Sequence, residues 1–164
     1  MKFINRKAEL EFLEKKYNSS NSEFLIFYGR RRIGKTCLIS KFSKNKNSMY
    51  FMGRLESRED TIKRFNTLLI DKFKDTSLIN NPFQNFDAIF DYLADNSKNK
   101  ILLIIDEFPF LVEKFPEIIS ILQDKWDSKL KNTKLKLIIL GSSVGMMEKY
   151  ALEYKSPLYG RRTG

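Results

Sequence analysis

The sequence of 164 residues contains no histidine and only one cysteine, Cys37. Without histidine there can be no His-based catalytic triad, and most zinc and iron sites are excluded because they depend on imidazole ligands. One cysteine cannot form an internal disulfide bond, and Cys37 is better explained as a small packing residue than as a nucleophile. Sites for hard cations, which are built from oxygen ligands, are left open.

Long hydrophobic runs are also missing. No stretch of 18 or more apolar residues occurs, and residues 1–6 do not lead into the apolar segment of a signal peptide. Neither membrane insertion nor secretion is indicated, and we expect a cytoplasmic protein. Apolar residues nevertheless make up 42% of the chain, which is enough for the core of one globular domain.

Acidic residues are scarce at both ends of the chain, and the formal net charge is +10. Residues 1–56 carry 13 Lys and Arg against 5 Asp and Glu, and residues 131–164 carry 7 against 2. A basic surface of this kind suits nucleic acid as a partner. Solvated lysines explain the same charge more simply, because no recognition helix or base-stacking motif accompanies it.

One stretch matches the phosphate-binding P-loop pattern Gly-x-x-x-x-Gly-Lys-Ser/Thr at every position: Gly29, Arg30, Arg31, Arg32, Ile33, Gly34, Lys35 and Thr36. Residues 24–28, which precede it, form an apolar run of strand length. Apolar residues at helical spacing follow it in residues 37–42. This is the order of strand, loop and helix that the motif requires.

Each residue type of the motif has its own chemical purpose. Gly29 and Gly34 allow backbone dihedrals that turn successive N–H groups toward an anion. The start of the following helix adds unpaired N–H groups and the positive end of its dipole. Lys35 should reach the β- and γ-phosphates and the Thr36 hydroxyl should bind Mg²⁺. We include the adjacent Cys37 among the nucleotide-binding positions.

A second signature follows 71 residues after Lys35. Residues 100–105 form a nearly pure branched-aliphatic run, which is typical of a strand buried on both faces of a parallel sheet. The run ends in Asp106 and Glu107. Asp106 is the expected Mg²⁺ ligand of a Walker B motif, and Glu107 is placed to orient and deprotonate an attacking water.

The other segments complete an α/β pattern with a parallel sheet. Strands are expected at residues 24–28, 48–52, 100–105 and 135–140. Helices are expected at residues 6–18, from Ser57, from Asn85, at 116–130 and at 144–150, with a turn at 108–111. The last strand leads to Ser142, a candidate sensor of the γ-phosphate or of the water, although small residues also end strands for turn reasons alone.

These motifs, with Phe3-Ile4-Asn5-Arg6 and Ser156-Pro157-Leu158-Tyr159-Gly160-Arg161, resemble the archaeal ATPase family related to AAA+ proteins, STAND regulators and origin-recognition ATPases. The resemblance covers essentially the whole chain. It implies a three-layer P-loop NTPase sandwich with strand order 5-1-4-3-2. It also implies that Phe3, Ile4 and Arg6 lie near the adenine, and that Arg161 lies near the γ-phosphate, in cis or across a subunit boundary.

Only four strands are accounted for, so we expect residues 1–164 to be the ATPase core of a longer protein, lacking the fifth strand, the helical lid and any effector domain. The function indicated is Mg²⁺-dependent binding and hydrolysis of ATP that drives a conformational switch. Three alternatives stay open: a regulatory module that holds ADP or ATP with little turnover, a nucleotide or small-molecule kinase, and a motor stimulated by nucleic acid. Besides the nucleotide, the expected partner is the missing C-terminal part or a second copy of the chain.

Overall fold

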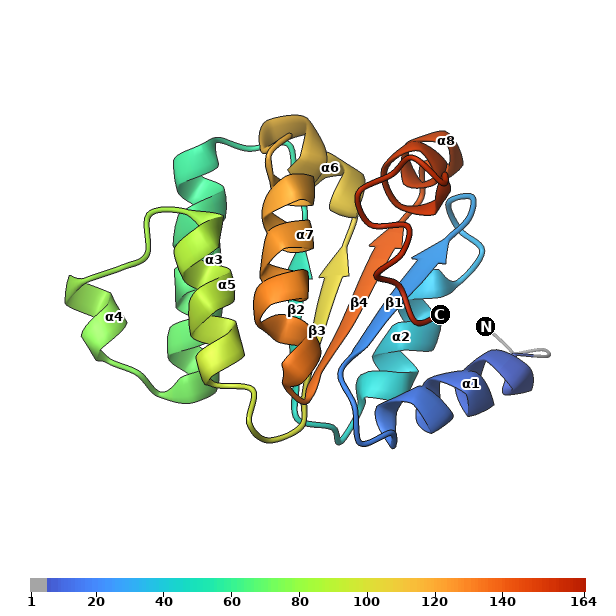
Figure 1. Ribbon diagram of the computed structural model, residues 1–164, viewed down its shortest axis with the longest axis horizontal. Coiled ribbons are helices and arrows are strands. Elements are labelled where there is room, and N and C mark those ends of the chain that lie inside the picture. The colour runs from blue at the N-terminus through green and yellow to red at the C-terminus, as the bar shows by residue number, and fades with distance from the viewer. Residues whose placement is uncertain (1–5) are drawn as a thin grey trace.

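The computed structural model describes residues 6–164, so Phe3 and Ile4 lie outside the described residues. Within this range the centre of the molecule is a sheet of four parallel strands in the order β1-β4-β3-β2. The strands are β1 (Glu23–Tyr28), β2 (Ser48–Met52), β3 (Ile101–Asp106) and β4 (Leu135–Gly141). This order confirms the α/β P-loop fold expected from the sequence and places β3 and β4 in the middle of the sheet (Figure 1).

The two central strands are buried on both faces along their whole length. Their β-branched and aliphatic side chains suit this position because helices cover both faces of a parallel sheet. Alternation along each strand divides the side chains between two clusters: Leu137 and Ile139 of β4 face one layer of helices, whereas Ile138 and Leu140 face the other. The result is a three-layer sandwich.

One face of the sheet is covered by α1 (Lys7–Tyr17) and α2 (Lys35–Ser43). The buried side chains of α2 recur at helical spacing, and Leu38, Ile39 and Phe42 pack with Leu13 of α1 against the sheet. This layer is small and leaves the outer face of β2 open, where Tyr50 and Met52 are 41% and 36% exposed.

The opposite face is covered by a larger layer that includes α3 (Arg58–Phe73), α5 (Phe86–Asp95) and α7 (Ile118–Ser128). Two of these helices begin as the sequence predicts: the Ser57 hydroxyl accepts a hydrogen bond from the N–H of Asp60 at 3.0 Å, and the Asn85 side chain accepts one from that of Ala88 at 2.9 Å. Aromatic residues fill the layer, among them Phe65, Phe86, Phe90 and Trp126.

Several short elements differ from the sequence-based expectation. Residues 108–111, which we expected to form a turn, begin the helix α6 (Phe108–Lys114). Proline is tolerated in the first turn of a helix because its missing N–H would have no intrahelical partner there, so Pro109 starts a helix here. The other short elements are α4 (Ser77–Asn80), η1 (Leu130–Asn132), α8 (Val144–Met147) and the π-helix η2 (Glu148–Leu152).

The last described residues run beside the outer edge of β1. The N–H of Thr163 donates to the carbonyl of Phe24 at 2.7 Å, and the N–H of Ile26 donates to the carbonyl of Gly164 at 3.1 Å. This edge is the position that the resemblance assigns to a fifth strand. Among residues 6–164, no helix combines the length and the apolar character needed to cross a membrane.

Candidate nucleotide-binding site

The P-loop joins the end of β1 to the start of α2. Gly29 has φ +149° and Gly34, the N-cap residue of α2, has φ +84°; both values lie in the region that favours glycine. Arg32 between them also has a positive φ, +63°. The first turn of α2 contains no acidic residue, so nothing there offsets the positive end of the helix dipole. The local geometry suits an anion.

Lys35 is buried, and its ammonium group lies within its own loop. It donates hydrogen bonds to the carbonyls of Gly29 at 2.6 Å and Arg30 at 2.9 Å. Burial lowers the pKa of Lys35 below its ordinary value, and the nearby carboxylates of Glu107 and Asp106 oppose that shift. The two acids of the second motif thus favour the charged form of Lys35.

The two sequence motifs meet at Thr36 and Asp106. The Thr36 hydroxyl donates a hydrogen bond to Oδ2 of Asp106 at 2.9 Å, although the residues are 70 positions apart in the chain. Asp106 is 3% exposed at the end of β3. Mg²⁺ prefers hard oxygen ligands and is usually bound by one or two protein oxygens together with phosphate oxygens. A hydroxyl and a carboxylate in contact provide such protein oxygens, so these two residues fit a magnesium ion.

Glu107 follows directly and is held from the neighbouring strand. The hydroxyl of Ser142, which comes just after β4, donates a short hydrogen bond to Oε1 of Glu107. Glu107 is only partly buried, so its carboxylate keeps access to solvent. The structure therefore brings together Lys35, Thr36, Asp106, Glu107 and Ser142 at the carboxyl end of the sheet, where open α/β folds place their ligands.

Gly53, which the sequence analysis did not single out, follows β2 and contacts the backbone of Asp106 and Glu107 from the side opposite Ser142. Its N–H donates to the carbonyl of Asp106 at 2.8 Å, and a Cβ atom on Gly53 would lie 2.5 Å from the carbonyl oxygen of Glu107. Glu107 itself has φ +50°, which is uncommon for a residue with a side chain. The only sequence signal was a glycine directly after an expected strand.

Tyr50 of β2 is the second residue that the sequence analysis did not assign to the site. Its hydroxyl donates to Oδ2 of Asp106 at 2.5 Å, so this oxygen also receives a hydrogen bond from outside the P-loop. Strand alternation could have placed Tyr50 on the face opposite Met49 and Phe51, but not opposite a particular partner.

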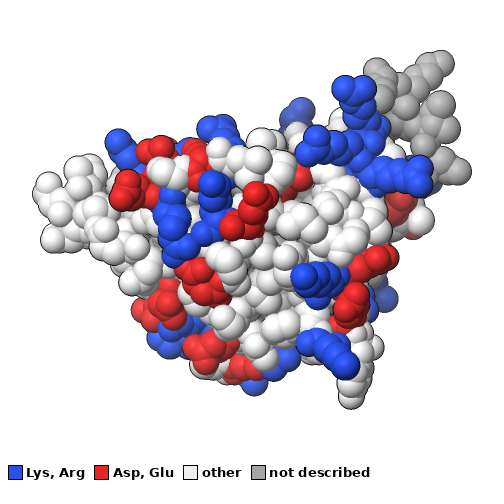
Figure 2. All heavy atoms as spheres, turned by 90° about the horizontal axis from the view of Figure 1, so that it is seen from above, with Lys and Arg blue, Asp and Glu red and all other residues white. Residues whose placement is uncertain are grey.

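Basic side chains lie around the P-loop. Arg6 donates a short hydrogen bond from its guanidinium to the carbonyl of Ile33, which places this predicted adenine-side residue beside the loop. Arg30, Arg31 and Arg32 are exposed. In the view from above, basic side chains gather at the upper right, whereas both signs of charge mix over the opposite end (Figure 2).

One expectation about the loop is wrong. Cys37 is exposed and does not pack in the core. The face of α2 that meets the sheet is formed by Leu38, Ile39 and Phe42, and Cys37 falls outside this helical stripe.

Arg161 is not brought to the P-loop. Its guanidinium binds the Asp127 carboxylate, with the shortest contact at 2.6 Å, and the carbonyl of Pro157 at 2.9 Å. Asp127 is in the last turn of α7, which leads to the start of β4, so this ion pair lies toward the amino end of the parallel strands and away from the P-loop at their carboxyl end. The position near the γ-phosphate that the resemblance implied in cis is not formed, and a role across a subunit boundary stays a prediction.

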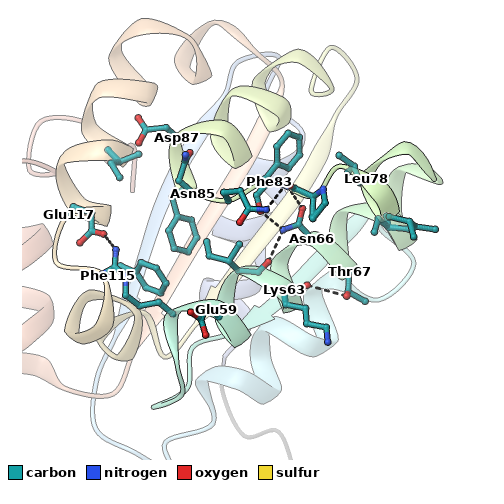
Figure 3. Close-up of a pocket in the computed structure, with 18 residues that line it drawn as sticks. Glu59, Lys63, Asn66, Thr67, Leu78, Phe83, Asn85, Asp87, Phe115 and Glu117 are labelled. Atoms are coloured by element: carbon teal, nitrogen blue, oxygen red, sulfur yellow. Dashed lines mark hydrogen bonds and ion pairs between the residues drawn. The ribbon is translucent and has the colours of Figure 1, made fainter.

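A separate groove of about 830 Å³ lies on the other side of the molecule, between α3, α4, α5 and the start of α7. The close-up shows Asn66 and Phe83 linked by hydrogen bonds in its wall, and Glu117 at one end (Figure 3). Glu117 forms an ion pair with Arg58, which also lines the groove. No P-loop residue lines this groove, which is therefore distinct from the nucleotide-binding site.

Comparison with known families supports the same assignment. The model of an ATPase domain found predominantly in Archaea matches residues 3–164. The chain belongs to this family. An uncharacterized protein of Methanocaldococcus jannaschii is 44% identical over 162 residues, which are 99% of this chain and 34% of that protein. The domain is thus an ATPase domain, and it spans about a third of the length of this relative.

A second relative, matched over a shorter segment, is described as ATP-binding. An uncharacterized ATP-binding protein of Methanocaldococcus jannaschii is 61% identical over 44 residues, which are 27% of this chain and 75% of that protein.

Solved structures share the fold of this ATPase domain. A Walker-type ATPase of Pyrococcus abyssi superposes with a TM-score of 0.72 and 22% identity over 95% of this chain and 51% of that protein. The ORC2 protein of Aeropyrum pernix, solved as ADPNP and ADP complexes, superposes with a TM-score of 0.60 and 19% identity over 90% of this chain and 44% of its own. At this identity the likeness concerns the fold alone.

Proposed function

We propose that this domain binds ATP together with Mg²⁺ and hydrolyses it, with Glu107 as the residue that activates water. The observation that carries the proposal is the contact of Thr36 with Asp106, which joins the phosphate-binding loop to the acidic strand end. Glu107 lies next to that contact and its carboxylate is oriented by Ser142. Membership in an ATPase family supports the same reaction.

In this proposal each residue acts at a defined atom. The N–H groups of the loop and the ammonium of Lys35 bind the phosphate oxygens. Thr36 and Asp106 would hold Mg²⁺, which neutralises charge on the triphosphate when bound. The Glu107 carboxylate takes a proton from water as the water oxygen bonds to the γ-phosphorus, and the bond to the bridging oxygen breaks to leave ADP.

Glu107→Gln tests the assignment because it keeps the size and hydrogen bonding of the side chain but removes the base. We expect phosphate release to fall by about 10²- to 10⁴-fold while ATP binding is retained. Glu113→Gln, an exposed residue of α6, serves as the matched control and should leave both unchanged. Equal phosphate release from the parent protein and Glu107→Gln would remove Glu107 from this role.

The same experiment separates hydrolysis from nucleotide holding. A protein that binds ATP tightly but shows no single turnover would be a regulatory module, and Glu107→Gln would then match the parent protein. We propose that hydrolysis has a conformational output, because Ser142 connects the Glu107 carboxylate to α8 and the following π-helix. Such π-helical turns are rare and frequently occur at functional sites.

Nucleic acid is a second candidate partner, favoured by the exposed Arg30, Arg31 and Arg32 beside the site. A Drosophila origin recognition complex bound to DNA shares the fold, with a TM-score of 0.65 and 18% identity over 92% of this chain and 40% of its own. DNA that raises the ATPase rate, with binding that weakens steeply as salt increases, would support this alternative. An ATPase rate that does not change when DNA is added would argue against nucleic acid as a partner.

A further inference from the structure

The carboxylate of Asp106 receives hydrogen bonds from three directions. Its Oδ1 accepts from the N–H of Glu107 at 2.8 Å. Its Oδ2 accepts from the hydroxyl of Thr36 at 2.9 Å and from the hydroxyl of Tyr50 at 2.5 Å. Two of these donors belong to the sequence motifs. Tyr50 belongs to neither, and it comes from the edge strand.

Strand pairing explains how Tyr50 reaches this carboxylate. In the parallel register of β2 and β3, Tyr50 is opposite Ile104 and Met52 is opposite Asp106. Side chains at paired positions share a face of the sheet, so Tyr50 and Asp106 are diagonal neighbours on one face. Such diagonal neighbours are within reach of a long aromatic side chain. Met49 and Phe51 are buried on the opposite face, which fixes the direction of Tyr50.

We infer that Tyr50 is a positioning residue for the magnesium-nucleotide site, which fixes the rotation of the Asp106 carboxylate through its hydroxyl. This inference rests on the proposed function. A carboxylate that binds a metal directly or through water must hold its lone pairs in one orientation. Hydrogen bonds from neighbouring residues provide that orientation, and their loss typically weakens metal affinity by about 10- to 100-fold.

The phenol of Tyr50 can donate one hydrogen bond, and its hydroxyl uses that donor on Oδ2 of Asp106. Tyr50 as a whole residue is 41% exposed, because the small α1–α2 layer leaves this face of β2 open. Tyr50 therefore contributes little to the core, which makes a purely structural effect of removing one hydroxyl small.

Tyr50→Phe removes the hydroxyl and keeps the ring. We would measure binding of ATP as a function of Mg²⁺ concentration, and separately binding of ATP in EDTA. The expected result is a Mg²⁺ midpoint about 10- to 100-fold higher than in the parent protein, with ATP affinity in EDTA unchanged.

The matched control is Tyr92→Phe. The Tyr92 hydroxyl also donates to a carboxylate, that of Asp75 at 2.9 Å, but on α5 in the opposite layer. It should leave the Mg²⁺ midpoint at the parent value. If the parent protein binds ATP and Tyr50→Phe shares its Mg²⁺ midpoint, the positioning role is refuted while the proposed function stands. If the parent protein binds no nucleotide with or without Mg²⁺, the proposed function fails and this inference fails with it.

Discussion

Gly53 sets how closely the edge strand approaches the acidic pair, and Gly53→Ala tests this packing. An added Cβ would lie 2.5 Å from the carbonyl oxygen of Glu107 and 3.3 Å from that of Asp106. Ordinary contacts of a Cβ begin near 3.4 Å, so the backbone must move apart by about 0.9 Å. No flexible side chain can absorb this movement, because the contacted atoms all belong to the main chain.

Two consequences of Gly53→Ala can be measured. Overpacking of this kind costs about 1–3 kcal/mol, which for a domain of this size lowers the melting temperature by roughly 2–12 °C. A displacement of catalytic groups by about 1 Å can reduce turnover by about 10²-fold. Phosphate release should therefore fall far more than ATP binding, since the P-loop lies on β1 at the other edge of the sheet.

Gly145→Ala is the matched control, because an added Cβ there meets nothing within 4 Å. It should leave melting temperature and phosphate release close to those of the parent protein. If Gly53→Ala behaves like Gly145→Ala in both assays, the close approach of β2 does not fix the position of Glu107, and the reasoning is refuted.

Two further predictions concern regions outside the site. Asn66 is 4% exposed; its side-chain oxygen accepts a hydrogen bond from the N–H of Phe83 at 2.8 Å, and its amide group donates to the carbonyls of Phe83 and Ile62. Asn66→Ala should therefore lower the free energy of unfolding by about 1–3 kcal/mol, measured by thermal unfolding, and leave ATP binding unchanged. A loss of ATP binding would contradict this prediction. The hydrogen bond from Arg161 lowers the pKa of Asp127 below 3.8, so their pair stabilises the folded state above that pH and loses this contribution as pH falls through the lowered pKa. Because the pair is partly exposed, the loss should stay below about 1 kcal/mol, and Asp127→Asn should remove this component from an acid titration of stability, whereas an unchanged titration would count against it.

The sequence was sufficient to predict features that are local in the chain. The P-loop and the run before Asp106 carry their own strand context, and the aliphatic composition of residues 100–105 already implies a strand covered on both faces. The contact of Thr36 with Asp106 then follows, because the carboxyl ends of parallel strands share one edge of a sheet.

Features that depend on tertiary placement could not be predicted in this way. The contact of Tyr50 with Asp106 requires the register of β2 against β3, which no local pattern specifies. Arg161 was assigned by its position in a motif, but its partner Asp127 comes from a helix 34 residues away and could be found only in the folded chain. The exposure of Cys37 depends on where α2 begins, because a shift of one residue rotates the helix by about 100°.

The arrangement of the strands lets substitutions affect the phosphate-binding loop and the acidic residues of the site separately. The phosphate-binding loop follows β1, whereas the acids follow β3 and are held by Ser142 after β4 on one side and by Tyr50 and Gly53 of the β2 segment on the other. Since β1 and β2 form opposite edges of the described sheet, a change in the β2 segment reaches the acids before it reaches the loop. Substitutions there should therefore weaken Mg²⁺ affinity and hydrolysis while nucleotide binding in EDTA persists. A parallel loss of nucleotide binding in EDTA would mean that the loop and the acids respond as one unit.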